Sequence, residues 1–161
     1  GMRKVMVYLI ENRLIDVLVS TGANLFHDLH ESLGYAHYKG SPHADDTELA
    51  RHKINRIYDV FASEAEYIEM DQFITRFANG LDEDHAYTTR EFFYHLGRHI
   101  APQAKEEGIL TAAARAGVPI YCPAFGDSVY GFAVSMLWNS QHPLLLPLKV
   151  LDCAPEELKN T

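Results

Sequence analysis

Short runs of β-branched and other apolar residues alternate along this chain with stretches in which apolar residues recur at the spacing of a helix. Residues 15–19 form one such run, which predicts a buried parallel strand that stops at Ser20. Helical spacing resumes at Asn24 and is expected to end at Gly34, a residue type that commonly follows a helix. A second run at 118–123 predicts another strand.

The same patterns predict the remaining elements. Helical spacing is found at 5–10, between the caps Ser63 and Gly80, after Thr88 or Thr89, at 109–116 up to Gly117, and at 129–138. Glu66, three residues after Ser63, predicts a capping box at that helix start. The helix at 129–138 is mostly apolar and is expected to be buried on several sides. A third strand is predicted at 144–151, at a sheet edge or with a late start, because the proline within it cannot donate a ladder hydrogen bond. Residues 35–46 are rich in Gly, Pro, His and Asp and predict a surface loop that could cover a site.

Strands separated by helices define the expected fold class. Parallel strands need crossover connections, and these are usually helices that pack on the sheet. The pattern therefore predicts an α/β protein with a three-layer, Rossmann-like parallel sheet and helices on both faces. Since the sequence shows no linker and no internal repeat, residues 2–161 are expected to form a single domain.

Composition narrows the classes of partner. The net charge of −8 argues against nucleic acid, which needs a clustered basic surface, and suits a cationic ligand better. The chain has no run of about 18 apolar residues, so a membrane span is not expected. Its two cysteines, Cys122 and Cys153, lack metal-type or disulfide-framework spacing. We expect buried thiols and a cytoplasmic location.

Two predicted strand ends carry candidate chemistry, because ligands of open parallel sheets bind beyond the carboxyl ends of the strands. At the first end, Ser20, Thr21 and Gly22 combine hydroxyls with a residue that lets the backbone approach a ligand. At the second, Asp127 could hold a ribose hydroxyl or an amine. The alternative for both turns is a simple helix cap. No G-x-G-x-x-G follows either strand, so spacing alone names no cofactor.

Four segments, in order, resemble one family. Residues 13–22 (RLIDVLVSTG) are similar to the strand "VDVLVTTAGG" of deoxyhypusine synthase, and residues 54–57 (INRI) are similar to its "INRI" segment. Residues 96–98 (LGR) match in position, and residues 118–128 (VPIYCPAFGDS) resemble its "IPVFSPALTDGS" strand and turn. The resemblance covers nearly the whole chain.

That resemblance implies an NAD-dependent transferase. Enzymes of this type pass a hydride from spermidine to NAD, and move an aminobutyl group through an enzyme lysine to a protein lysine or another amine acceptor. Carried over by position, Ser20, Thr21, Gly22 and Asp127 would contact NAD, and His27 and Asn55 would belong to the substrate site. The resemblance also implies a homo-oligomer, a tetramer or a dimer.

Departures from the family pattern concern the polyamine and the lysine. Phe26 and His27 occupy the places of an acidic pair, and Phe132 the place of an aspartate that holds spermidine. The chain's lysines have no family context and are Lys4, Lys39, Lys53, Lys105, Lys149 and Lys159. No catalytic residue can be assigned. The sequence corresponds to a central portion of the family, truncated at both ends, so a complementary C-terminal chain could complete the site.

Two rival hypotheses stay open. The first is a catalytically inactive domain that binds a nucleotide, a polyamine or a partner chain. The second is a metal-dependent hydrolase, since His27, Asp28, His30 and Glu31 fall on adjacent helical turns, although a solvated helix face has the same pattern and we predict no metal site.

Overall fold

The computed structural model describes residues 2–82 and 85–139. Its elements in chain order are α1 (Arg3–Glu11), β1 (Leu18–Val19), α2 (Gly22–Ser32), β2 (Tyr38–Lys39), α3 (Asp46–Arg51), β3 (Ile54–Ile57), β4 (Val60–Ser63), α4 (Glu64–Asn79), α5 (Thr89–Ile100), α6 (Ile109–Ala116), β5 (Ile120–Tyr121), the 3₁₀ turn η1 (Phe125–Asp127) and α7 (Val129–Asn139). Every predicted helix is present. The two predicted strands that fall within the described residues are also present, but each is only two residues long.

Two separate sheets organise these elements. β1 and β5 pair in parallel, with Leu18 opposite Ile120 and Val19 opposite Tyr121. β2, β4 and β3 form an antiparallel sheet in that order. The α/β class with a parallel sheet is therefore confirmed. Among the described residues the parallel sheet has two strands, so the three-layer arrangement stays a prediction, and the strand expected at 144–151 lies outside these residues.

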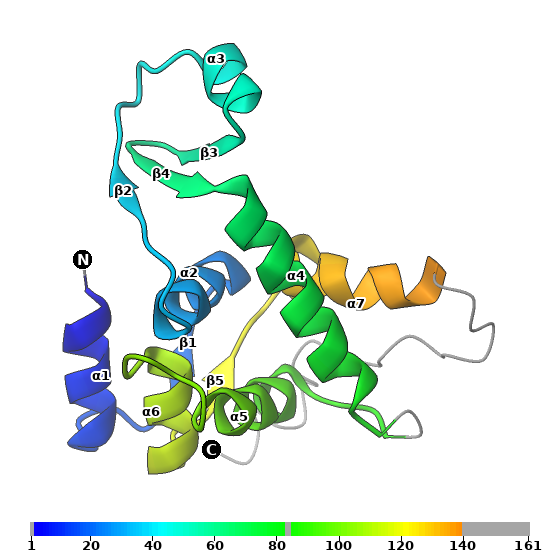
Figure 1. Ribbon diagram of the computed structural model, residues 1–161. Coiled ribbons are helices and arrows are strands. Elements are labelled where there is room, and N and C mark those ends of the chain that lie inside the picture. Colours follow the sequence, from blue (N-terminus) through cyan, green and yellow to red (C-terminus); the bar gives the residue numbers. More distant parts are fainter. Residues whose placement is uncertain (1, 83–84, 140–161) are drawn as a thin grey trace.

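Figure 1 shows two regions that differ in character. The body consists of α1, α2, α4 to α7 and the β1–β5 pair. The arm, residues 38–63, consists of β2, α3, β3 and β4 and stands at one end of the molecule, joined to the body through the segment before β2 and through α4 (Figure 1). The sequence predicted neither the antiparallel sheet nor β2, which lies inside the expected loop at 35–46.

The body is held together by an aromatic core. Phe92 and Phe93 of α5 are fully buried, as is Tyr130 of α7. The Phe93 and Tyr130 rings meet edge to face with centroids 5.0 Å apart, a favourable geometry for aromatic pairs. Helices α5 and α6 approach closely at Gly97, where an added Cβ would lie 2.3 Å from the Leu110 carbonyl oxygen, so this position requires glycine.

Local capping chemistry explains several helix ends. Thr88 caps α5 in a reciprocal arrangement with Glu91, and α6 ends at Gly117 in the left-handed conformation with φ 70°. Ser63 does occupy the cap of α4, but its side chain makes no capping hydrogen bond, so the capping box predicted there is wrong. No helix in the described ranges is long and apolar enough to cross a membrane.

The predicted burial of α7 on several sides does not hold at Phe132. Among the described side chains of this helix, Tyr130, Ala133 and Val134 are buried, but Phe132 is 69% exposed. Phe132 and Ile68 of α4 contribute to an apolar groove between these two helices, of about 650 Å³. The side chain of Trp138 lies outside the described residues.

Candidate functional site

The turn between β1 and α2 places three of the predicted site residues. The Ser20 backbone N–H donates to the Tyr121 carbonyl at 3.0 Å, which extends the parallel pairing to the end of the strand. Thr21 is the N-cap of α2, and its hydroxyl accepts from the Asn24 backbone N–H at 3.4 Å. Thr21 therefore caps the helix, which is the alternative to ligand binding considered for this turn. The Thr21 side chain is nevertheless exposed to solvent.

Gly22 brings the two strand ends together. It is buried, and a Cβ at this position would lie 2.2 Å from the Ser128 Cβ. Only glycine lets the first turn of α2 pack this closely against the turn between β5 and α7. Asp127 ends η1 in that second turn, directly before Ser128, and its side chain lies outside the described residues. Two turns far apart in sequence thus pack against each other.

A cleft opens where α1, β1 and α2 meet, with a volume of about 510 Å³. Ser20 and His27 both line it, so the structure brings these two predicted residues to one place. The cleft also contains residues that sequence reasoning missed, Arg3, Asn24 and Glu31. Asn24 and Glu31 could have been found from their spacing, because with His27 they recur every three to four residues and share one face of a helix.

The floor of this cleft contains a buried ion pair. The Asp28 carboxylate accepts from Arg3 Nε at 3.0 Å and from the backbone N–H groups of Ile109 and Leu110 at 2.8 and 3.1 Å. Asp28 therefore caps the N-terminus of α6 from a neighbouring helix. Burial raises the pKa of the Asp28 carboxyl, opposed by these donors. Asp28 therefore has a structural role, because it joins α2 to α1 and α6.

Three histidines, His27 and His30 of α2 and His37 of the segment that leads into β2, gather beside this cleft. The rings of His27 and His37 lie 5.0 Å apart and those of His30 and His37 4.6 Å apart. His30 is completely buried, and its Nε2 lies 3.1 Å from Glu66 Oε2 without hydrogen-bond alignment. Burial, followed by the neighbouring His37 and His27, lowers the pKa of His30 to about 4, so this ring is neutral at pH 7.

The placement of Asp28 and His30 bears on the metal hypothesis. Asp28 engages Arg3 and α6, whereas His30 packs against Tyr35, His37 and Tyr67. Within residues 2–82 and 85–139, no three His, Cys, Asp or Glu side chains converge as metal ligands would. Although Asp28 and His30 are close in sequence, their side chains do not meet at one point where they could bind a metal ion together.

Asn55 lies apart from the cleft. It belongs to β3 in the arm, where it pairs with Ala62 of β4, and Figure 1 shows this strand at the far end from β1. Its neighbour Arg56 makes a bidentate ion pair with Asp46 at 2.6 and 2.7 Å. In a single copy of this chain, Asn55 and Ser20 do not share a site.

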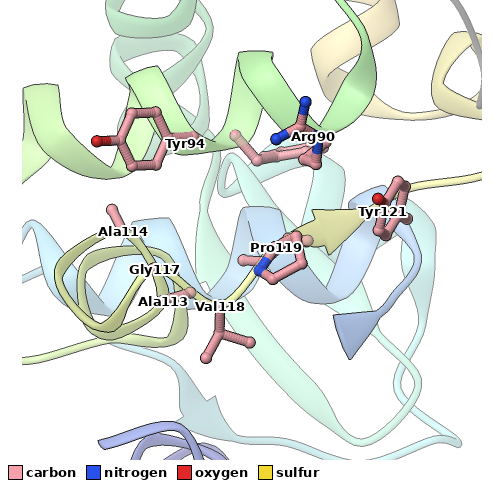
Figure 2. A pocket seen from close by; sticks show the side chains of 10 residues that line it. Arg90, Tyr94, Ala113, Ala114, Gly117, Val118, Pro119 and Tyr121 are labelled. Atoms are coloured by element: carbon pink, nitrogen blue, oxygen red, sulfur yellow. The ribbon is translucent and has the colours of Figure 1, made fainter. Parts of the chain in front are cut away.

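A second hollow, of about 520 Å³, lies beside β5. Figure 2 shows Arg90 and Tyr94 on the α5 side of this hollow, facing Pro119 on the connection between α6 and β5, with Tyr121 on β5 at its end. Cys122, next along the chain, is fully buried, as predicted. Cys153 lies outside the described residues.

Fold and site together define a class: an α/β protein with a cleft, lined by polar and apolar residues, at the carboxyl end of a parallel strand. The comparisons give the family. The family model for deoxyhypusine synthase matches residues 1–152. The chain belongs to the deoxyhypusine synthase family, which confirms the resemblance seen in the sequence.

Similar proteins include curated relatives and a solved structure. The chain is 48% identical over 137 residues to "Probable deoxyhypusine synthase 2" of Methanosarcina mazei, covering 84% of this chain and 39% of the relative. It is 39% identical to a "Deoxyhypusine synthase-like protein" of Chlorobaculum parvum, covering 87% and 41%. A crystal structure described as a "putative deoxyhypusine synthase" of Entamoeba histolytica has the same fold, with a TM-score of 0.68 at 16% identity, covering 99% of this chain and 46% of that one. The chain spans less than half the length of these relatives.

Proposed function

We propose that this chain supplies the strand-end part of a site for NAD and a polyamine such as spermidine, in a transferase that moves an aminobutyl group to a lysine or amine acceptor. The observation that carries the proposal is the close packing of the β1–α2 turn against the β5–α7 turn at Gly22. This packing brings the ends of β1 and β5 together, and the end of β1 lines the cleft, in the place where open parallel sheets bind their ligands.

The residues present suit such a ligand. The Ser20 hydroxyl and the N-terminal turn of α2 offer donors for a phosphate or ribose, with Thr21 and Gly22 in that turn and Asp127 across it. The carboxylate of Glu31 suits an ammonium group, and His27 stands beside it. Bound NAD would supply the acceptor for a hydride. The protein's part here would be to bind and orient the amine.

The covalent step would need a residue from elsewhere. Among residues 2–82 and 85–139, no lysine lines this cleft. We therefore propose that the lysine is supplied by further polypeptide, either in a longer protein or in a complementary chain. The same observation supports a second candidate function, in which this chain binds its ligand without chemistry.

The proposed assembly includes a larger sheet. The parallel sheets of α/β proteins usually contain more than two strands and are covered by helices on both faces. We propose that further strands extend the β1–β5 pair into the three-layer arrangement, and the hollow beside β5 in Figure 2 is where the next layer would begin. We also propose a homo-oligomer, supported by the exposed Phe132 in its apolar groove, and a cytoplasmic setting, which suits the buried Cys122.

Titration calorimetry with NAD tests the binding proposal. Asn24 is exposed and lines the cleft, so Asn24→Trp should block the ligand and abolish binding. The matched control is Asn79→Trp, an exposed asparagine in the last turn of α4, which should bind NAD like the unsubstituted chain. Absence of NAD binding to the unsubstituted chain would end the proposal. NAD binding without NADH absorbance on addition of spermidine would favour the binding-only function.

A further inference from the structure

Three residues form a hydrogen-bonded series that ends at the cleft. His37 Nδ1 lies 3.0 Å from Glu31 Oε1, and His37 Nε2 lies 3.1 Å from His27 Nδ1. We call Glu31, His37 and His27 the histidine relay. His27 and Glu31 are one turn apart on α2, and His37 comes from the segment that leads into β2. The His37 side chain is 13% exposed, so the middle of the relay is largely shielded from water, whereas the Glu31 side chain is 42% exposed.

The chemistry of the three groups gives this series a direction. A carboxylate can only accept hydrogen bonds, so His37 must carry its proton on Nδ1 to donate to Glu31. A neutral His37 then accepts at Nε2, and His27 must donate from Nδ1. A neutral His27 is left with a lone pair on Nε2. Burial and the adjacent His37 lower the pKa of His27, which favours this neutral form at pH 7.

We propose that Glu31 and His37 are positioning residues that hold His27 in the tautomer with an accepting Nε2, to which an ammonium group in the cleft hydrogen-bonds. The proposal deepens the proposed function and rests on it for the class of ligand. The neutral His27 ring, connected to the Glu31 carboxylate through His37, would bind an ammonium group by a hydrogen bond. It would not add a second ion pair to the one that the ammonium group can make with Glu31. His27 lines the cleft together with Ser20 and Glu31.

The charged and titratable surroundings of His27 come from several elements. On α2 these are His30 and Glu31, and from the segment before β2 they are His37 and Tyr35. Helix α4 contributes Tyr67, whose hydroxyl is 3.4 Å from His27 Nδ1, and Glu66. From α1, Arg3 lies 3.6 Å from Glu31. Acidification that protonates His27 would replace the lone pair with a donor, so amine binding should weaken as pH falls.

Nitrogen-15 NMR of the histidine rings tests the relay directly. The unsubstituted chain should show His27 protonated on Nδ1 and unprotonated on Nε2 at pH 7, with the signals assigned from their loss in His27→Gln. His37→Phe should return His27 to the opposite tautomer, whereas His37→Gln should preserve it, since an amide can donate to Glu31 and accept from His27. A His27 ring protonated on Nε2 in the unsubstituted chain would overturn the proposal.

Amine binding supplies the second measurement. Titration with spermidine should shift the His27 Nε2 resonance, and His37→Phe should weaken binding about tenfold while His37→Gln does not. If His37→Phe does not fold, Glu31→Leu provides the tautomer test on the unsubstituted histidines, because a leucine side chain cannot accept from His37 Nδ1. The matched control is His52→Phe, because His52 makes the same 3.0 Å contact to a carboxylate, Glu48, on the exposed surface of the arm. It should leave every His27 signal unchanged.

The outcomes separate the relay from the proposed function. The tautomer measurement needs neither NAD nor an amine. A correct tautomer without NAD binding would remove the NAD proposal and leave the relay standing. NAD binding with the wrong tautomer, or with a His27 resonance that spermidine does not move, would remove the relay alone.

Discussion

The body and the arm of this protein contain the same kind of ion pair in opposite surroundings. In the body, Arg3 and Asp28 meet at 3.0 Å with side chains that are 12% and 2% exposed. In the arm, Arg56 and Asp46 meet at 2.6 Å with 23% and 66% exposed. The shorter contact is in the more hydrated place, where water screens it and solvates each partner separately. Distance alone therefore does not rank these interactions.

The same difference extends to apolar contacts. The body buries whole aromatic side chains, whereas Ala62 is the one fully buried residue among 38–63, all of which are described. Regions with few buried apolar contacts open locally at low free-energy cost. We infer that the arm depends on the body for its order, through α4 and through the histidines packed where the two regions join.

The largest expected effect is in the aromatic core. Phe93→Ala removes a ring that is 1% exposed and packs edge to face on Tyr130. It should lower the free energy of unfolding by about 3–5 kcal/mol, measured by urea denaturation. Tyr58→Ala in the arm, where the side chain is 72% exposed, should change it by less than about 0.5 kcal/mol. Equal losses would contradict the contrast between the two regions.

The two ion pairs give the next test. Asp28→Asn should cost about 2–3 kcal/mol, because an amide cannot accept from Arg3 and both α6 N–H groups as a carboxylate does. Arg3 would keep only its more exposed partners, Glu31 and Glu106. Asp46→Asn should leave the free energy of unfolding nearly unchanged, with any small loss removed by high salt. A salt-insensitive loss at Asp46 equal to that at Asp28 would show that the arm pair is effectively buried.

A pH dependence of stability should come from His30. Its pKa is about 4 in the folded protein against an ordinary 6.5, so the unfolded chain binds its proton more readily. The stability contributed by this histidine is present above pH 6.5 and is lost as pH falls toward 4, by about 2 kcal/mol after allowance for screening by solvent. His30→Phe should flatten the unfolding free energy over this window, and His52→Phe, in the exposed arm, should not.

The smallest effect is expected at the turn of the arm. Tyr58 follows β3, precedes β4 by two residues and has φ 55°, a conformation that costs a bulky residue. Tyr58→Gly should therefore stabilise the arm by about 0.5 kcal/mol, seen as slower amide hydrogen exchange in β3 and β4. Asp59→Gly, next to it at ordinary φ, should speed that exchange. A faster exchange in Tyr58→Gly would show that the tyrosine ring, rather than its backbone, determines the turn.

Local patterns predicted the helices of the body correctly because their signals lie within a few residues. The caps at Thr88 and Gly117 are examples, since the groups that satisfy each helix end are its own sequence neighbours. The same logic failed at Ser63, where the right spacing to Glu66 exists but the serine makes no capping bond. Glu66 lies instead beside His30, a contact that no local pattern encodes.

The candidate site was predictable only as separate pieces. Ser20 and His27 were identified from the strand end and the resemblance, and both line the cleft. Asn55 was placed in the same site by resemblance, yet it lies on the arm, because the sheet to which β3 belongs could not be inferred from four residues without their pairing partners. The exposure of Phe132 could not be predicted for the same reason. An apolar helix predicts burial, but the residues that would cover a given face of it are far away in the sequence.

By itself the sequence determined the helices of the body, the two short parallel strands, the family and the polar residues at the strand ends. These depend on periodicity, capping and motif, which act between residues close together along the chain. Tertiary structure alone decided that Gly22 packs on Ser128, that Asp28 caps α6 from 81 residues away, and that His37 joins Glu31 to His27. Such contacts depend on how helices pack, and packing is settled by the whole set of buried surfaces rather than by any one segment.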